Sequence, residues 1–83
     1  MSFHVEVDPA ALADYRRLDP ADRRVVREVL GALVLDGVPV DAEIIAGEKD
    51  AYRVNIGEDL VMLVLGFESE VFVSAIIPRI WQL

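Results

Sequence analysis

Cysteine is absent from the 83 residues, and histidine and tryptophan occur once each. Without cysteine, a disulfide, a thiolate metal site and a cysteine nucleophile are all excluded. The single histidine, His4, excludes a metal site built from several histidines. No Gly-rich phosphate loop and no calcium-loop spacing is present either. We therefore expect neither a metal nor a cofactor.

Long apolar runs are also missing. The longest, Leu60 to Phe67, has eight residues including Gly66, which suits a strand and is too short for a membrane span. The first residues lack the basic region and apolar core of a secretory signal. We therefore expect a cytoplasmic protein that does not associate with membranes.

Basic residues are few. Eight Lys and Arg stand against 15 Asp and Glu, for a net charge of −7 and an isoelectric point near 4.4. From Asp36 onward there are nine acids and only Lys49, Arg53 and Arg79. Nucleic-acid-binding domains usually present a basic patch. This charge disfavours RNA or DNA as a partner.

Apolar residues are abundant, at 54% of the chain with a mean hydropathy of +0.38. A disordered chain would be poor in such residues. A chain of 83 residues has room for one domain, which we expect to span residues 1–83.

Two Asp-Pro pairs mark helix starts in the first half. Phe3, Val5 and Val7 alternate with polar residues, which predicts a strand over residues 3–7. Asp8-Pro9 and Asp19-Pro20 each combine an N-capping carboxylate with a proline suited to the first helical position. We expect helices over residues 9–18 and 20–36, the second ended by Gly37 and closely packed on a neighbour at Gly31.

The second half reads as strands. Residues 52–56, 60–67 and 71–77 are strand-like and separated by short turns, after a connector over residues 38–50. The order is strand, helix, helix and three strands. We expect an α+β fold in which two helices pack on one face of a largely antiparallel four-stranded sheet.

The last two strands are apolar at nearly every position. Two helices can cover only one face of a sheet, so the other face should expose an apolar surface that binds a partner or a second copy of the chain. In the alternative, the C-terminal residues of the chain fold back and cover this face. The residues expected at this surface are Leu60, Met62, Val64, Phe72, Ile76 and Trp81.

The stretch from Gly47 to Gly57 resembles the RelE/ParE toxin superfamily. In that family a loop glycine precedes a strand with a Tyr-Arg pair, a second basic residue two positions later, and a glycine; here Tyr52-Arg53-Val54-Asn55-Ile56-Gly57 occupies these places. The order of elements is similar along nearly the whole chain. The resemblance implies a toxin of a bacterial type II toxin–antitoxin pair, bound by a cognate antitoxin. The resemblance also implies that such a toxin acts by cutting mRNA on the ribosome without a metal, as RelE does, or by poisoning gyrase, as ParE does.

Only part of the ribonuclease residue set carries over. Arg53 and Arg79 match basic positions of the family, and the resemblance gives them a catalytic role in holding phosphate. Asn55 replaces a second basic residue, and Asp59-Leu60 stands where the family has a Tyr-Arg pair, so that arginine is missing. His4 is a candidate for proton transfer. The alternative for Arg53, Arg79 and His4 is that they are ordinary solvated side chains. The alternative is a catalytically silent interaction module with the same fold, which homodimerises or binds a protein through its apolar sheet face.

Overall fold

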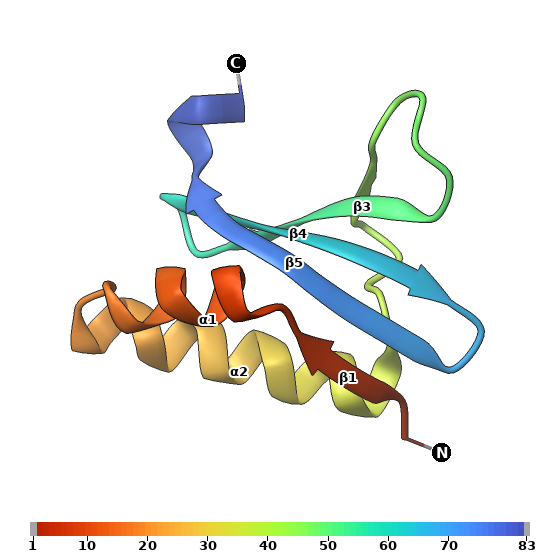
Figure 1. Cartoon of the computed structure of the whole chain (residues 1–83), viewed down its shortest axis with the longest axis horizontal. Helices are drawn as coiled ribbons and strands as arrows, with labels where there is room; N and C mark the ends of the chain where they lie inside the picture. The colour runs from red at the N-terminus through yellow and green to blue at the C-terminus, as the bar shows by residue number, and fades with distance from the viewer. Residues whose placement is uncertain (1, 83) are drawn as a thin grey trace.

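The computed structural model describes residues 2–82, with side chains as far as residue 80. The expected order of two helices and four longer strands is confirmed, with one short strand added (Figure 1). The elements are β1 (His4–Val7), α1 (Pro9–Arg16), α2 (Pro20–Asp36), β2 (Glu43–Ile44), β3 (Ala51–Ile56), β4 (Leu60–Phe67), β5 (Glu70–Pro78) and the 3-10 helix η1 (Arg79–Gln82).

Both helices begin at the aspartates that the sequence predicts. The side chain of Asp8 accepts a hydrogen bond from the backbone N–H of Ala10, and that of Asp19 from Asp22, each at 2.8 Å. Each bond satisfies a helix N–H that has no partner within the helix. At the other end of α2, Gly37 has a φ of 74° and ends the helix as expected.

Gly31 does not have the expected role. It lies exposed on α2, and a Cβ added there would meet no atom within 4 Å. The prediction that Gly31 allows close packing is therefore wrong. The close approaches occur at Gly37, where a Cβ would lie 2.8 Å from the Phe3 ring, and at Gly66, where it would lie 2.6 Å from Cγ2 of Val38.

The sheet has five strands in the order β1-β5-β4-β3-β2. β3, β4 and β5 form the expected antiparallel meander, and β1 pairs in parallel with β5. β2 lies within the segment expected to be a connector and pairs through Glu43 and Ile44 alone. Two residues are too few to produce an alternating pattern, so the sequence does not reveal this strand.

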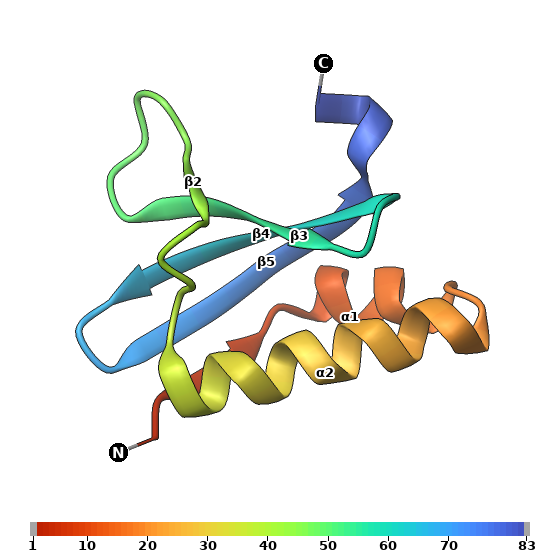
Figure 2. The same ribbon diagram turned by 180° about the vertical axis from the view of Figure 1, so that it is seen from behind.

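Both helices cover the same face of the sheet (Figures 1 and 2). The core lies between these two layers: Val26 and Leu33 of α2 are fully buried together with Met62 of β4 and Val73 of β5. The pairing of β4 with β5 shifts register between Leu63 and Val64. No helix within residues 2–82 is long and apolar enough to cross a membrane.

Candidate functional site

The face of the sheet that the helices leave uncovered is the candidate site, and we call it the open face. The cross-strand register places Ala51, Arg53 and Asn55 of β3 opposite Leu65, Leu63 and Val61 of β4 on this face. Residues two apart on a strand share a face, so Tyr52, Val54 and Ile56 point to the helices, as the core cluster confirms.

Four residues that the sequence assigned to the partner surface lie on the helix-covered face instead. Leu60, Met62, Val64 and Ile76 are between 0 and 8% exposed and belong to the core. They are therefore not available at the surface of the folded chain. The sequence alone could not determine which alternate residues of β4 face the helices. The strand is apolar at positions of both faces, and its pairing with β3 decides which set is buried.

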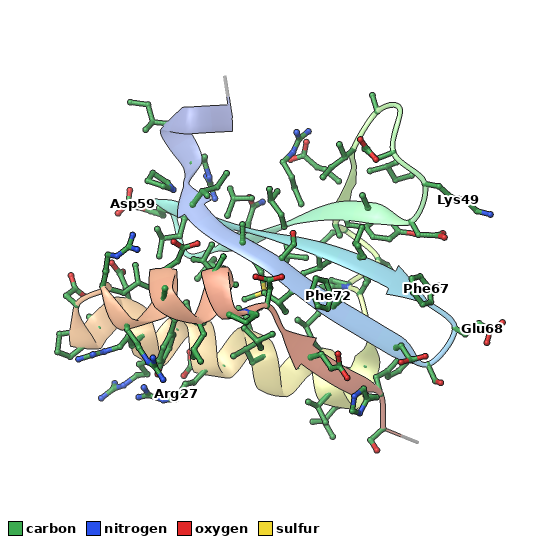
Figure 3. The ribbon with its side chains drawn as sticks, in the orientation of Figure 1. Arg27, Lys49, Asp59, Phe67, Glu68 and Phe72 are labelled. Carbon is green, nitrogen blue, oxygen red and sulfur yellow. The ribbon has the colours of Figure 1, made fainter. Side chains whose placement is uncertain are left out.

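Other apolar side chains of β4 are exposed on the open face. Leu65 is 37% exposed and Phe67 is 53% exposed. Phe72 is half-buried beside them, since it pairs with Leu65 across β4 and β5 (Figure 3). Phe72 thus keeps its expected place on the open face. Trp81 belongs to η1 by its backbone, and its side chain lies outside the described part of the chain.

Arg53 and Arg79 are each engaged within the chain. Nη2 of Arg53 lies 3.3 Å from Oε2 of Glu43 on β2, and the Arg53 side chain is 31% exposed. Nη2 of Arg79 donates to the carbonyl of Gly57 at 3.0 Å. Arg53 therefore contacts the edge strand β2, and Arg79 contacts the turn between β3 and β4.

The two arginines do not share one position on the sheet. Pro78, just before Arg79, pairs with Leu60, which pairs with Ile56. Ile56 lies three residues beyond Arg53, about 10 Å along the strand. The backbone positions of Arg53 and Arg79 are therefore offset along the sheet and lie on different strands.

His4 and Glu6 lie at the opposite edge of the sheet. Nε2 of His4 is 3.0 Å from Oε1 of Glu6, and both side chains are exposed. Three strand spacings, about 14 Å, separate β1 from β3 and thus His4 from Arg53. The sequence could not reveal this separation, because it depends on strand order.

The helix layer holds five arginines among acids. Nη1 of Arg27 donates to the Tyr15 hydroxyl at 2.8 Å, and Nη1 of Arg17 lies 3.8 Å from Oδ1 of Asp14. This is the mixed, solvated surface expected of such a helix pair. Within residues 2–82, no group of three or more His, Asp or Glu side chains could hold a metal ion.

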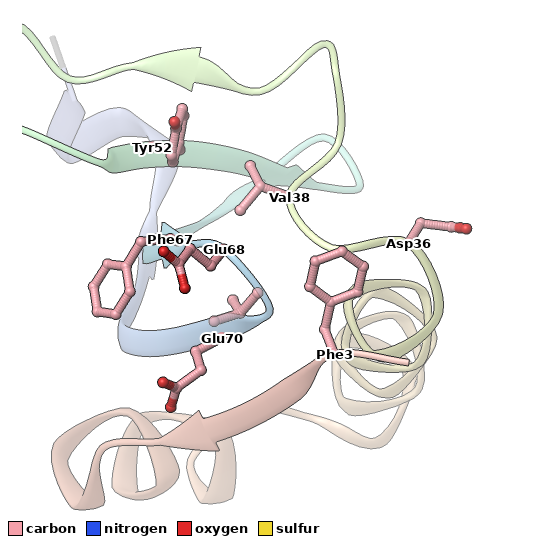
Figure 4. Close-up of a pocket in the computed structure, with 9 residues that line it drawn as sticks. Phe3, Asp36, Val38, Tyr52, Phe67, Glu68 and Glu70 are labelled. Atoms are coloured by element: carbon pink, nitrogen blue, oxygen red, sulfur yellow. The ribbon is translucent and has the colours of Figure 1, made fainter. Parts of the chain in front are cut away.

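A hollow opens at one end of the sheet, between the β4–β5 turn and the end of α2 (Figure 4). It has a volume of about 230 Å³, with Phe3, Val38 and Tyr52 among its apolar walls and Asp36, Glu68 and Glu70 as its charged residues. Its charged lining is acidic throughout. The electrostatics of this end of the molecule therefore oppose an anionic ligand.

Comparison with known proteins identifies the fold. No family model matches the chain. The toxin candidate RelE1 of Methanocaldococcus jannaschii is 27% identical over 82 residues, which cover 95% of this chain and 91% of that protein.

Two solved structures agree with this likeness. A chain of the archaeal RelE–RelB complex from Pyrococcus horikoshii superposes with a TM-score of 0.81 at 20% identity, covering 95% of this chain and 97% of that one. The isolated RelE toxin of E. coli superposes with a TM-score of 0.79 at 16% identity, covering 93% of this chain and 84% of that one. The chain thus has a RelE-type α+β fold, and the resemblance to the RelE/ParE toxin superfamily is confirmed.

Proposed function

We propose that this chain is the toxin component of a type II toxin–antitoxin pair and that a cognate antitoxin protein neutralises it. The observation that carries the proposal is likeness along almost the whole chain, in sequence to toxin candidate RelE1 and in fold to the RelE–RelB complex. Exposed Leu65 and Phe67, on the sheet face that the helices do not cover, support a protein partner. The proposal places the pair in the cytoplasm.

The target of the toxin is a separate part of the proposal. Cleavage of mRNA in the manner of RelE would use Arg53 and Arg79 to stabilise negative charge that develops on the phosphate. Their contacts with Glu43 and the Gly57 carbonyl would have to be exchanged for contacts with RNA. Gyrase poisoning in the manner of ParE makes no such demand on these residues.

A catalytically silent interaction module is the second candidate. The observation that favours it is the acidic charge of the sheet layer, where Asn55 and Leu60 occupy positions that are basic in ribonuclease members. Such a module would homodimerise or bind a protein through the open face, and it would leave growth unaffected.

Induced expression in a bacterial host separates the two candidates. Growth and the incorporation of labelled amino acids are followed after induction, with and without the product of the neighbouring small gene. The toxin proposal expects arrest that this product relieves, with translation stopping for a ribosomal target and a DNA-damage response for gyrase. Normal growth at high expression of folded chain would overturn it and favour the interaction module.

A further inference from the structure

A hollow on the open face combines aromatic walls with a carboxylate rim. Its volume is about 210 Å³, and it is lined by His4, Glu6, Leu65, Phe67, Glu70, Val71 and Phe72. The strand register builds it from two cross-strand rows. One row runs His4, Glu70 and Phe67, and the other runs Glu6, Phe72 and Leu65.

The carboxylates that line this hollow are Glu6 and Glu70, and His4, which also lines it, lies 3.0 Å from Glu6. Outside residues 8–36, which span both helices, the chain has nine acids and three bases, so the sheet layer and its loops carry nearly the whole net charge. Of the bases with contacts described above, Arg53 lies against Glu43 and Arg79 against the Gly57 carbonyl. Neither arginine lines the hollow. The field over the open face is therefore negative and repels phosphate.

A long basic side chain has the shape and charge that this hollow requires. Its aliphatic stem would lie on the rings of Phe67 and Phe72, and its cationic head would reach the carboxylates of Glu6 and Glu70. Arginine fits better than lysine, because its planar guanidinium stacks on aromatic rings and pairs with carboxylates through several N–H groups.

A second copy of this chain is a poor occupant. Residues 8–36 hold five arginines but also six acids, so the helix layer offers no net positive surface. Docking of that layer on the open face of another copy would also be head-to-tail, which produces rings or open filaments.

We propose that the open face binds a basic amphipathic segment of the partner protein, with an arginine of that segment in the hollow between Phe67, Phe72, Glu6 and Glu70. This inference rests on the proposed function, which supplies the need for a protein partner, and adds the chemistry of that partner. The antitoxin of this acidic toxin is then basic where it covers the sheet.

The test uses three short acetylated peptides in which leucine alternates with arginine, glutamine or glutamate. Each is titrated into the full isotope-labelled chain, and amide resonances are followed by NMR. We expect the arginine peptide to shift resonances of Leu65, Phe67, Glu70, Val71 and Phe72. It should bind about five-fold more tightly than the glutamine peptide, a factor at the upper end for an exposed ion pair, and the glutamate peptide should bind least.

Variants of the chain locate the charge effect. The double variant Glu6→Gln with Glu70→Gln should weaken the arginine peptide about five-fold. The matched control, Glu48→Gln with Glu58→Gln, removes the same charge at exposed positions outside the hollow and should change affinity less than about two-fold. Equal weakening by the two double variants would overturn the proposal, as would equal binding of the arginine and glutamine peptides.

Other occupants give distinct results. Shifts of the same resonances with protein concentration alone would assign the open face to a second copy, and tighter binding of an RNA oligonucleotide than of the arginine peptide would assign it to nucleic acid; either overturns the proposal. A chain that arrests growth but does not distinguish the peptides overturns this inference alone. A chain that binds as expected but never arrests growth supports this inference and overturns the toxin role.

Discussion

The hydroxyl of Ser74 donates a hydrogen bond to the carbonyl of Leu63 at 3.1 Å, where the pairing of β4 and β5 shifts register. Leu63 pairs with Ala75 and Val64 with Val73, so Ser74 is the extra residue of a β-bulge. The bulge allows Val73 and Ile76, three residues apart, both to reach the core. Ser74, the one polar residue in the apolar run from Val71 to Ile77, therefore has a structural role.

Replacement of Ser74 by alanine tests this role. The Leu63 carbonyl loses a partner in a half-buried position, and we expect Ser74→Ala to lower the free energy of unfolding by about 1 kcal/mol. Urea denaturation followed by circular dichroism measures the change. Ser69→Ala, in the exposed β4–β5 turn, is the control and should fall within about 0.5 kcal/mol of the parent. Equal losses for the two variants would show that the bond contributes nothing.

Gly66 is predicted to be intolerant of a side chain. A Cβ there would lie 2.6 Å from Cγ2 of Val38, so Gly66→Ala should destabilise the fold by about 1 to 3 kcal/mol through overpacking. Val38→Ala removes the clashing methyl group. The double variant should therefore be more stable than the sum of the two single losses predicts, by about 1 kcal/mol. Strict additivity in denaturation curves would contradict the clash.

Gly31 should respond in the opposite direction. No atom lies within 4 Å of a Cβ added at this exposed helical position. Because glycine is about 1 kcal/mol less favourable than alanine within a helix, Gly31→Ala should stabilise the chain by up to about that amount. A rise in thermal midpoint measures it, and a fall would reveal a contact on this side of α2.

The cap of α2 gives a matched pair of aspartate substitutions. Asp19 accepts the backbone N–H of Asp22, so Asp19→Ala should cost about 1 kcal/mol. Asp36→Ala removes the same charge at the C-terminal end of α2, where a negative charge is unfavourable, and should be neutral or stabilising by about 0.5 kcal/mol. Equal destabilisation would point to net charge rather than to the cap.

Growth assays of arginine variants test the RNA-cleavage branch of the proposed function. If the chain cuts mRNA, Arg53→Ala and Arg79→Ala should each abolish the arrest while the circular dichroism spectrum stays unchanged. Arg24→Ala, on the exposed surface of α2, is the matched control and should leave the arrest intact. Arrest that survives both sheet substitutions would exclude this mechanism and direct attention to gyrase.

Local chemistry let the sequence determine the helices and the longer strands. The Asp-Pro pairs place both helix starts because a carboxylate cap and a proline act within a few residues. The short turns after Ile56 and Phe67 likewise predict the antiparallel pairing of β3, β4 and β5. These signals depend on neighbours in the chain and need no tertiary information.

The acidic charge and the excess of apolar strand surface were also readable from the sequence. What only the tertiary structure decided is which side chains share a face. The register of β4 with β3 determines which residues of β4 face the helices, and the bulge at Ser74 changes which residues of β5 do so. The parallel pairing of β1 with β5 brings His4 and Glu6 beside Phe72 and away from Arg53. Pairing between distant segments sets these relations, because a uniformly apolar strand has no pattern of its own to define its buried side.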